Sequence, residues 1–195
     1  MSEALLNQFL ESKNRLAACL DATYEQTRVD VVSTVNSMVK TFSSGGRVMV
    51  CGNGGSAADA MHFTGELVAT FQRGVPRPAL SAIALSSDLA TITAYANDFT
   101  YDEVFSRQVR AHGRKGDCLL AISTSGKSRN IIRAAEEARS VGISVISITG
   151  LSGRKLASLS DVAITIPSED TQVIQNTYQF LLHIICYGIE SQLRA

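Results

Sequence analysis

The sequence has no tryptophan, only three prolines and no excess of charge of either sign. Its 18 Lys and Arg residues balance 18 Asp and Glu residues, so we expect neither nucleic acid nor a membrane as a partner. No apolar run approaches the ~20 residues of a membrane span. The first residues also lack the basic stretch of a signal peptide, so we expect a cytoplasmic protein.

Cysteines are few and scattered, and none of the four lies at a short spacing from another: Cys19, Cys51, Cys118 and Cys186. This pattern indicates neither a disulfide framework nor a zinc knuckle. We expect all four to behave as small buried apolar residues in a reducing compartment.

The first 45 residues have the pattern of helices. Apolar residues between Leu5 and Leu20 form one stripe, and those between Val32 and Phe42 form another, before Gly45 and Gly46 end the run. We therefore expect a two-helix hairpin over residues 1–45, a feature that often packs against a partner subunit. The rest of the 195-residue chain, 46–195, is long enough for one core and too short for two domains.

From residue 47 short runs rich in β-branched residues alternate with helical patterns. Strands are predicted at residues 47–51, 81–85, 118–123, 144–149 and 162–166. Helices are predicted at 57–70, 89–96, 102–111, 129–141 and 171–193. The alternation predicts an α/β fold with a parallel five-stranded sheet flanked by helices. In such sheets ligands bind at the carboxyl ends of the strands.

The first predicted strand runs into a glycine-rich segment, Gly52-Asn53-Gly54-Gly55-Ser56, before a helix. Glycines allow a ligand to approach the backbone closely, and a helix N-terminus favours an anion. A dinucleotide-binding fingerprint would require glycine where Ala57 stands, so we reject that reading. The alternative is a plain tight turn between strand and helix.

Hydroxyl side chains follow the third predicted strand: Ser123, Thr124, Ser125 and Ser128. The run Gly126-Lys127-Ser128 resembles the end of a P-loop, but the first glycine of that motif would fall at Ala121. Hydroxyls before a helix also serve as caps, although four exceed what a cap requires. The two loops together favour an anionic, hydroxyl-rich ligand such as a sugar phosphate over a nucleotide.

Three histidines are present, and two lie in suggestive positions. His62 and Glu66 are spaced i, i+4, so they share a helical face and could hold a metal or a substrate; the alternative is a surface pair. His183 lies in an apolar helix, where a histidine is often a core residue, with Gln175 about two turns earlier. We expect His112 to face solvent without a role.

The run from Cys51 to Phe63 resembles the signature of bacterial phosphoheptose isomerases of the sugar-isomerase (SIS) family. Further matches to that family span nearly the whole chain, at residues 96–98, 104–109, 122–128, 148–150 and 173–175. The resemblance implies a single SIS domain over residues 1–195. It also implies an aldose–ketose isomerase that converts sedoheptulose 7-phosphate to D-glycero-D-manno-heptose 7-phosphate through an enediol(ate). That reaction is the first step of ADP-heptose and lipopolysaccharide core heptose biosynthesis.

The same resemblance assigns roles to individual residues. It implies Glu66 as the base and His183 as its acid/base partner, in a homotetramer whose sites form where subunits meet. One Zn²⁺ per subunit would be held by His62, Glu66, Gln175 and His183. Substrate contacts map to Asn53, Gly54, Gly55, Ser56, Glu66, Asn97, Asp98, Ser123, Thr124, Ser125, Ser128 and Gln175.

The chain departs from the family at two positions, because Asn176 and Tyr178 stand where Glu and His are usual. Two alternatives remain open beside the isomerase. One is a non-enzymatic SIS tetramer that binds the replication initiator protein, although such relatives lack counterparts of Glu66 and His183. The other is an SIS isomerase for another sugar phosphate, which the loops alone do not exclude.

Overall fold

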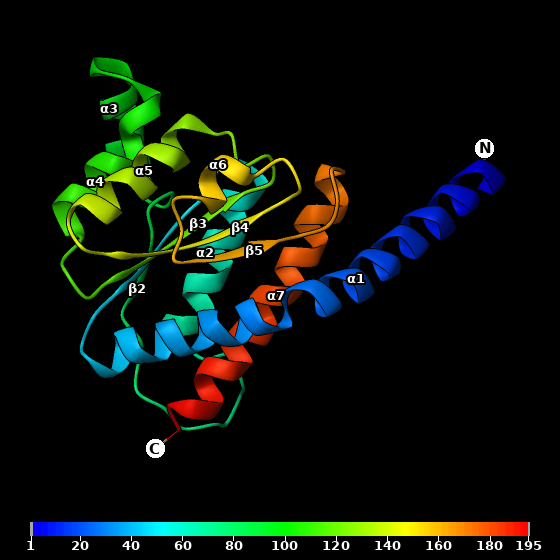
Figure 1. Ribbon diagram of the computed structural model, residues 1–195, viewed down its shortest axis with the longest axis horizontal. Helices are drawn as coiled ribbons and strands as arrows, with labels where there is room; N and C mark the ends of the chain where they lie inside the picture. The colour runs from blue at the N-terminus through cyan, green and yellow to red at the C-terminus, as the bar shows by residue number, and fades with distance from the viewer. Residues whose placement is uncertain (1, 195) are drawn as a thin grey trace.

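A computed structural model describes residues 2–194 and has an open sheet of five parallel strands at its centre (Figure 1). The strands are β1 (Val48–Cys51), β2 (Ala82–Ala84), β3 (Cys118–Ser123), β4 (Ser144–Thr149) and β5 (Val162–Thr165). They lie in the order β2-β1-β3-β4-β5, so the chain reverses direction across the sheet after β2. The predicted α/β fold with a parallel five-stranded sheet is confirmed.

Helices cover both faces of the sheet because alternate strand residues point to opposite sides. Val48 and Val50 pack with α1 (Ser2–Ser43), α2 (Gly55–Val68) and α7 (Thr171–Gln192). Met49 and Cys51 pack with α4 (Val104–His112) and α5 (Arg129–Ser140) on the other face. Figure 1 shows these two helical layers on opposite sides of the strands. All four cysteines are free and buried, as predicted.

The predicted hairpin at the N-terminus is wrong, because the structure has one continuous 42-residue helix, α1. Neither glycine nor proline occurs between Ser2 and Ser43, so the polar stretch between the two apolar stripes contains nothing that breaks a helix. The helix ends where Gly45 takes a positive φ of 76° and Gly46 N–H donates to the Thr41 carbonyl at 2.9 Å. Its first half extends away from the body of the molecule (Figure 1).

The remaining elements differ from prediction in detail. The helix expected at 102–111 is a short 3₁₀ turn, η1 (Tyr101–Glu103), followed by α4, and a four-residue helix, α6 (Arg154–Ala157), was not predicted. The helix α3 (Leu89–Asp98) has no buried residue and stands out from the molecule in Figure 1. No helix within residues 2–194 is long and apolar enough to cross a membrane.

Candidate active site

The glycine loop connects β1 to α2 at the carboxyl edge of the sheet, where the strand order reverses. Gly54 has a positive φ of 54°, and a Cβ at Gly55 would collide with the Gln175 side chain. This close approach ties the loop to α7. Cys51, just before the loop, takes no part in ionic chemistry near neutral pH, because burial raises the pKa of its thiol to about 12.

The hydroxyl loop after β3 is organised by its own side chains. Ser123 Oγ accepts from Gly126 N–H at 3.1 Å and donates to Ser128 Oγ at 3.3 Å. Ser125 Oγ accepts from Lys127 N–H at 3.2 Å, while Thr124 lies half-buried between them. Ser128 is the N-cap residue of α5 but makes no side-chain cap bond, so capping alone does not explain the hydroxyls.

Asn53 joins the glycine loop to α5 and η1 through contacts that the sequence did not predict. Its side-chain amide pairs with that of Asn130 in both directions, at 2.9 and 2.8 Å. Its Oδ1 also accepts from the Tyr101 hydroxyl at 3.0 Å. Asn130 is buried and Tyr101 is exposed, so Asn53 brings the start of α5 and η1 against the glycine loop.

Asn97 and Asp98 lie apart from these loops, at the exposed end of α3. Asn97 Nδ2 donates to Asp98 Oδ1 at 2.8 Å. Within residues 2–194 neither side chain hydrogen-bonds to the glycine or hydroxyl loop, so no such bond links this predicted pair to the other substrate contacts.

His62, Glu66 and His183 come together between α2 and α7. His62 Nε2 lies 2.9 Å from His183 Nε2, so one imidazole donates to the other, and 3.6 Å from Glu66 Oε1. The side chains of His62 and Glu66 are 42% and 24% exposed, so the group is open to solvent in the single chain. His183 is only half-buried, which argues against a core role. His112 is exposed, as predicted.

Gln175 and Ser56 have buried partners that sequence reasoning missed. Gln175 Nε2 donates to Asp59 Oδ2 at 3.0 Å, and the Ser56 and Tyr178 hydroxyls lie 2.8 Å apart. Burial raises the pKa of Tyr178, and the hydrogen bond with Ser56 opposes that rise. The Ser56 hydroxyl is therefore engaged within the protein, and its predicted contact with phosphate stays a prediction.

A preformed metal centre is not found among residues 2–194, where no group of three or more His, Cys, Asp or Glu side chains is arranged to hold an ion. His62 nevertheless lies close to both Glu66 and His183, and their two nitrogens and one oxygen are donors that zinc prefers. Gln175, the fourth predicted ligand, is turned to Asp59.

Known proteins resemble this chain over nearly its whole length. Residues 12–150 match the SIS domain family model. A phosphoheptose isomerase of Helicobacter pylori (strain P12) is 40% identical over 97% of this chain and 96% of its own length. One from Shewanella halifaxensis (strain HAW-EB4) is 43% identical over 99% and 96%. The chain belongs to the phosphoheptose isomerase family of SIS-domain proteins.

A solved phosphoheptose isomerase from Neisseria gonorrhoeae has the same fold, with a TM-score of 0.90 and 35% identity. The match covers 96% of this chain and 99% of that one. The fold described above is therefore shared with that solved structure over nearly the full length of both chains.

Proposed function

We propose that the chain is an aldose–ketose isomerase that interconverts sedoheptulose 7-phosphate and D-glycero-D-manno-heptose 7-phosphate. Family membership over nearly the full length supports a sugar-phosphate isomerase. The observation that carries the proposal is that Glu66 and His183 both lie close to the Nε2 atom of His62, because a carboxylate and an imidazole are the groups that this chemistry needs.

In the direction from ketose to aldose, the Glu66 carboxylate takes a proton from C1 of the sugar and returns it to C2. His183 moves one proton from the oxygen on C1 to the oxygen on C2, through an enediol(ate). No atom is gained or lost, so no other co-reactant is required. His62 orients the imidazole of His183 through the 2.9 Å contact between their Nε2 atoms.

The phosphate of the substrate is proposed to bind at the two loops. The glycine loop directly precedes α2, and the loop that carries Thr124 and Ser125 directly precedes α5, so both lie at helix N-termini, which favour an anion. Asn53, Gly54, Gly55, Ser123 and Ser128 complete the proposed contacts. This arrangement accounts for phosphate binding by a chain with a formal net charge of +0.

One Zn²⁺ per subunit is proposed at His62, Glu66 and His183, with Gln175 as a fourth ligand once it leaves Asp59. When bound, zinc supplies a Lewis acid that polarises the sugar carbonyl. A zinc-bound carboxylate is a weaker base than a free one. The change in turnover on adding zinc therefore shows which effect is larger, polarisation of the carbonyl or weakening of Glu66 as the base.

A homotetramer in the cytoplasm is the assembly that we propose. Large apolar side chains stay exposed in the single chain along α2 and α7, the helices that carry His62 and His183: Met61, Val68, Phe180, Ile184 and Tyr187. Contiguous exposed apolar surface is typical of a protein interface. A neighbouring subunit would cover this surface and offer a route for Asn97 and Asp98 to reach a site.

The test is turnover of sedoheptulose 7-phosphate by metal-stripped protein with and without added Zn²⁺. We expect aldoheptose phosphate to form, and a dependence on zinc would support the metal site. Glu66→Gln should lower kcat by at least about 100-fold while inorganic phosphate still binds, because only the base is lost. Glu137→Gln, on α5 away from the site, is the control. Near-native turnover by Glu66→Gln would rule out Glu66 as the base.

A further inference from the structure

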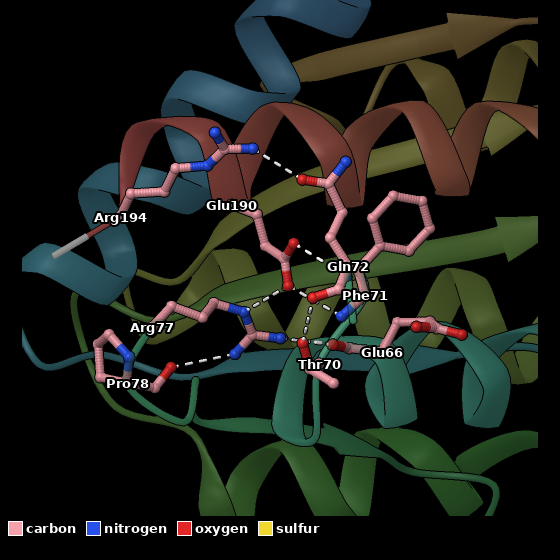
Figure 2. A network of polar contacts seen from close by, with 8 residues as sticks. All are labelled: Glu66, Thr70, Phe71, Gln72, Arg77, Pro78, Glu190 and Arg194. Carbon is pink, nitrogen blue, oxygen red and sulfur yellow. Dashed lines mark hydrogen bonds and ion pairs between the residues drawn. The ribbon is translucent and has the colours of Figure 1, made fainter. Parts of the chain in front are cut away.

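A buried ion pair holds the segment between α2 and β2 against α7. Arg77 Nε lies 2.7 Å from Glu190 Oε1, and both side chains are only 1% exposed. Glu190 Oε1 also accepts from Phe71 N–H at 2.8 Å, and Glu190 Oε2 accepts from Gln72 N–H at 3.1 Å. Figure 2 shows these bonds converging on the carboxylate. Each oxygen of Glu190 is therefore hydrogen-bonded.

One of the remaining nitrogens of Arg77 reaches the helix that carries the proposed base. Arg77 Nη2 donates to the Glu66 carbonyl at 2.6 Å, and Arg77 Nη1 donates to the Pro78 carbonyl at 3.0 Å. Glu66 lies in the last turn of α2, where backbone carbonyls lack partners within the helix. The guanidinium thus fixes the backbone of Glu66 (Figure 2).

The same ion pair is connected to His183 in two ways, through helix α7 and through Phe71. Glu190 follows His183 by seven residues on α7, about two helical turns, so both lie on one face of that helix. The Phe71 ring, whose backbone is bonded to Glu190, lies 5.8 Å from the His183 ring between centroids. Arg77 therefore contacts the backbone of Glu66, and Glu190 contacts the backbone of Phe71, whose ring lies beside His183.

Stability alone is a weak reason to bury such a pair. Taking two charges out of water costs several kcal/mol per ion, and apolar replacements of similar volume are often as stable. A buried pair that is fully hydrogen-bonded is better suited to fixing one geometry. Here the fixed geometry is that of Glu66 relative to His183.

We propose that Arg77 and Glu190 are positioning residues for the isomerase, which set the placement of Glu66 and His183 without touching the substrate. The proposal rests on the proposed function, because the reacting groups are those of the isomerisation. A displacement of about 1 Å in such a group can lower turnover by about 100-fold. Substrate binding at the loops after β1 and β3 does not depend on these two residues.

The kinetic test compares Glu190→Gln with Glu137→Gln in the full chain. Glu137 also pairs with an arginine, Arg110, at 2.7 Å, but on α5 and away from the site. We expect Glu190→Gln to lower kcat by about 10- to 100-fold with KM changed by less than about 3-fold, since positioning is lost and binding is kept. Glu137→Gln should change neither. Equal kinetics in folded Glu190→Gln and wild type would overturn the proposal.

A second readout does not require turnover. The chain has only three histidines, so the imidazole protons of His183 can be assigned by NMR with His62→Gln and His112→Gln as references. We expect Glu190→Gln and Arg77→Lys to shift the His183 resonances and leave those of His112 in place. Arg77→Lys keeps a positive charge beside Glu190 but loses the guanidinium that also bonds the Glu66 carbonyl, and it serves if Glu190→Gln fails to fold. Unshifted His183 resonances in Arg77→Lys and in any folded Glu190→Gln would overturn the proposal.

The two tests separate this proposal from the function on which it rests. Wild-type protein without turnover would remove the isomerase, while the NMR comparison would still decide whether the pair positions His183. Active wild type with an unaffected Glu190→Gln would keep the isomerase and remove the positioning role.

Discussion

At the scale of single residues, Tyr178 connects α7 to the glycine loop. The side chain is fully buried, and its hydroxyl lies 2.8 Å from Ser56 Oγ in the glycine loop. Asp59, one turn after Ser56, holds Gln175 at 3.0 Å. Tyr178 therefore supports the glycine loop from α7, whereas Asn176 is exposed and supports nothing within the single chain that the structure describes.

Removing the Tyr178 hydroxyl should loosen the glycine loop. We expect Tyr178→Phe to lower the free energy of unfolding by about 1–2 kcal/mol, because the buried Ser56 hydroxyl loses its partner. KM for sedoheptulose 7-phosphate should rise more than kcat falls, since the loop is proposed to bind and not to react. Urea unfolding and steady-state kinetics measure these effects.

The control for Tyr178→Phe is Ser191→Ala, which removes a hydroxyl from an exposed position on the same helix. Its unfolding free energy should stay within about 0.5 kcal/mol of wild type, as for most surface substitutions. Equal stability of the two variants would show that the bond between Ser56 and Tyr178 does not support the loop.

At the scale of helices and strands, the sequence predicted the sheet well and the first helix poorly. All five strands lie within one residue of their predicted ends, because short β-branched runs bounded by loops are typical of buried parallel strands. The hairpin was wrong because two separated apolar stripes were taken as two helices. One helix can change the face that it buries along its length without a turn.

Some features of the candidate site could likewise be predicted from the sequence and others could not. The positions of the glycine and hydroxyl loops could be predicted, because each directly follows a strand that the sequence predicts; their binding of an anion stays a prediction. The contacts of Ser56 with Tyr178, Asp59 with Gln175 and Phe71 with Glu190 join residues more than 110 positions apart. They depend on how α2 and α7 are placed side by side, which no local pattern encodes.

Continuity of α1 can be tested with a proline at Gln26, an exposed position between the two apolar stripes. We expect Gln26→Pro to lower the free energy of unfolding by about 3 kcal/mol, because proline removes a helical hydrogen bond and clashes with the preceding turn. Gln26→Ala, the control, should be neutral or slightly stabilising. A turn at this position would tolerate the proline, so equal stability of the two variants, measured in urea, would contradict a continuous helix.

At the scale of the whole molecule, the proposed active site and the exposed apolar surface occupy the same side of the sheet. An apolar groove between α1 and α7 is lined mainly by aliphatic and aromatic side chains, including Leu20, Val31, Val32, Phe180 and Ile184. Ile184 follows His183 directly and is 42% exposed. Assembly and chemistry are therefore close in space, since a subunit seated on the groove would contact Ile184, the residue next to His183.

A charge in this groove should separate the subunits. We expect wild-type protein to behave as a tetramer in light scattering and Ile184→Glu to give smaller species, because an unpaired carboxylate is costly to bury in an apolar interface. Turnover should fall with the tetramer fraction. Val141→Glu, which places the same charge at an exposed apolar position after α5 on the opposite face of the sheet, should remain a tetramer with unchanged turnover.

A monomeric wild type, or an Ile184→Glu variant that stays tetrameric, would contradict an interface at this groove. A dissociated variant with full turnover would instead show that one subunit completes the site alone.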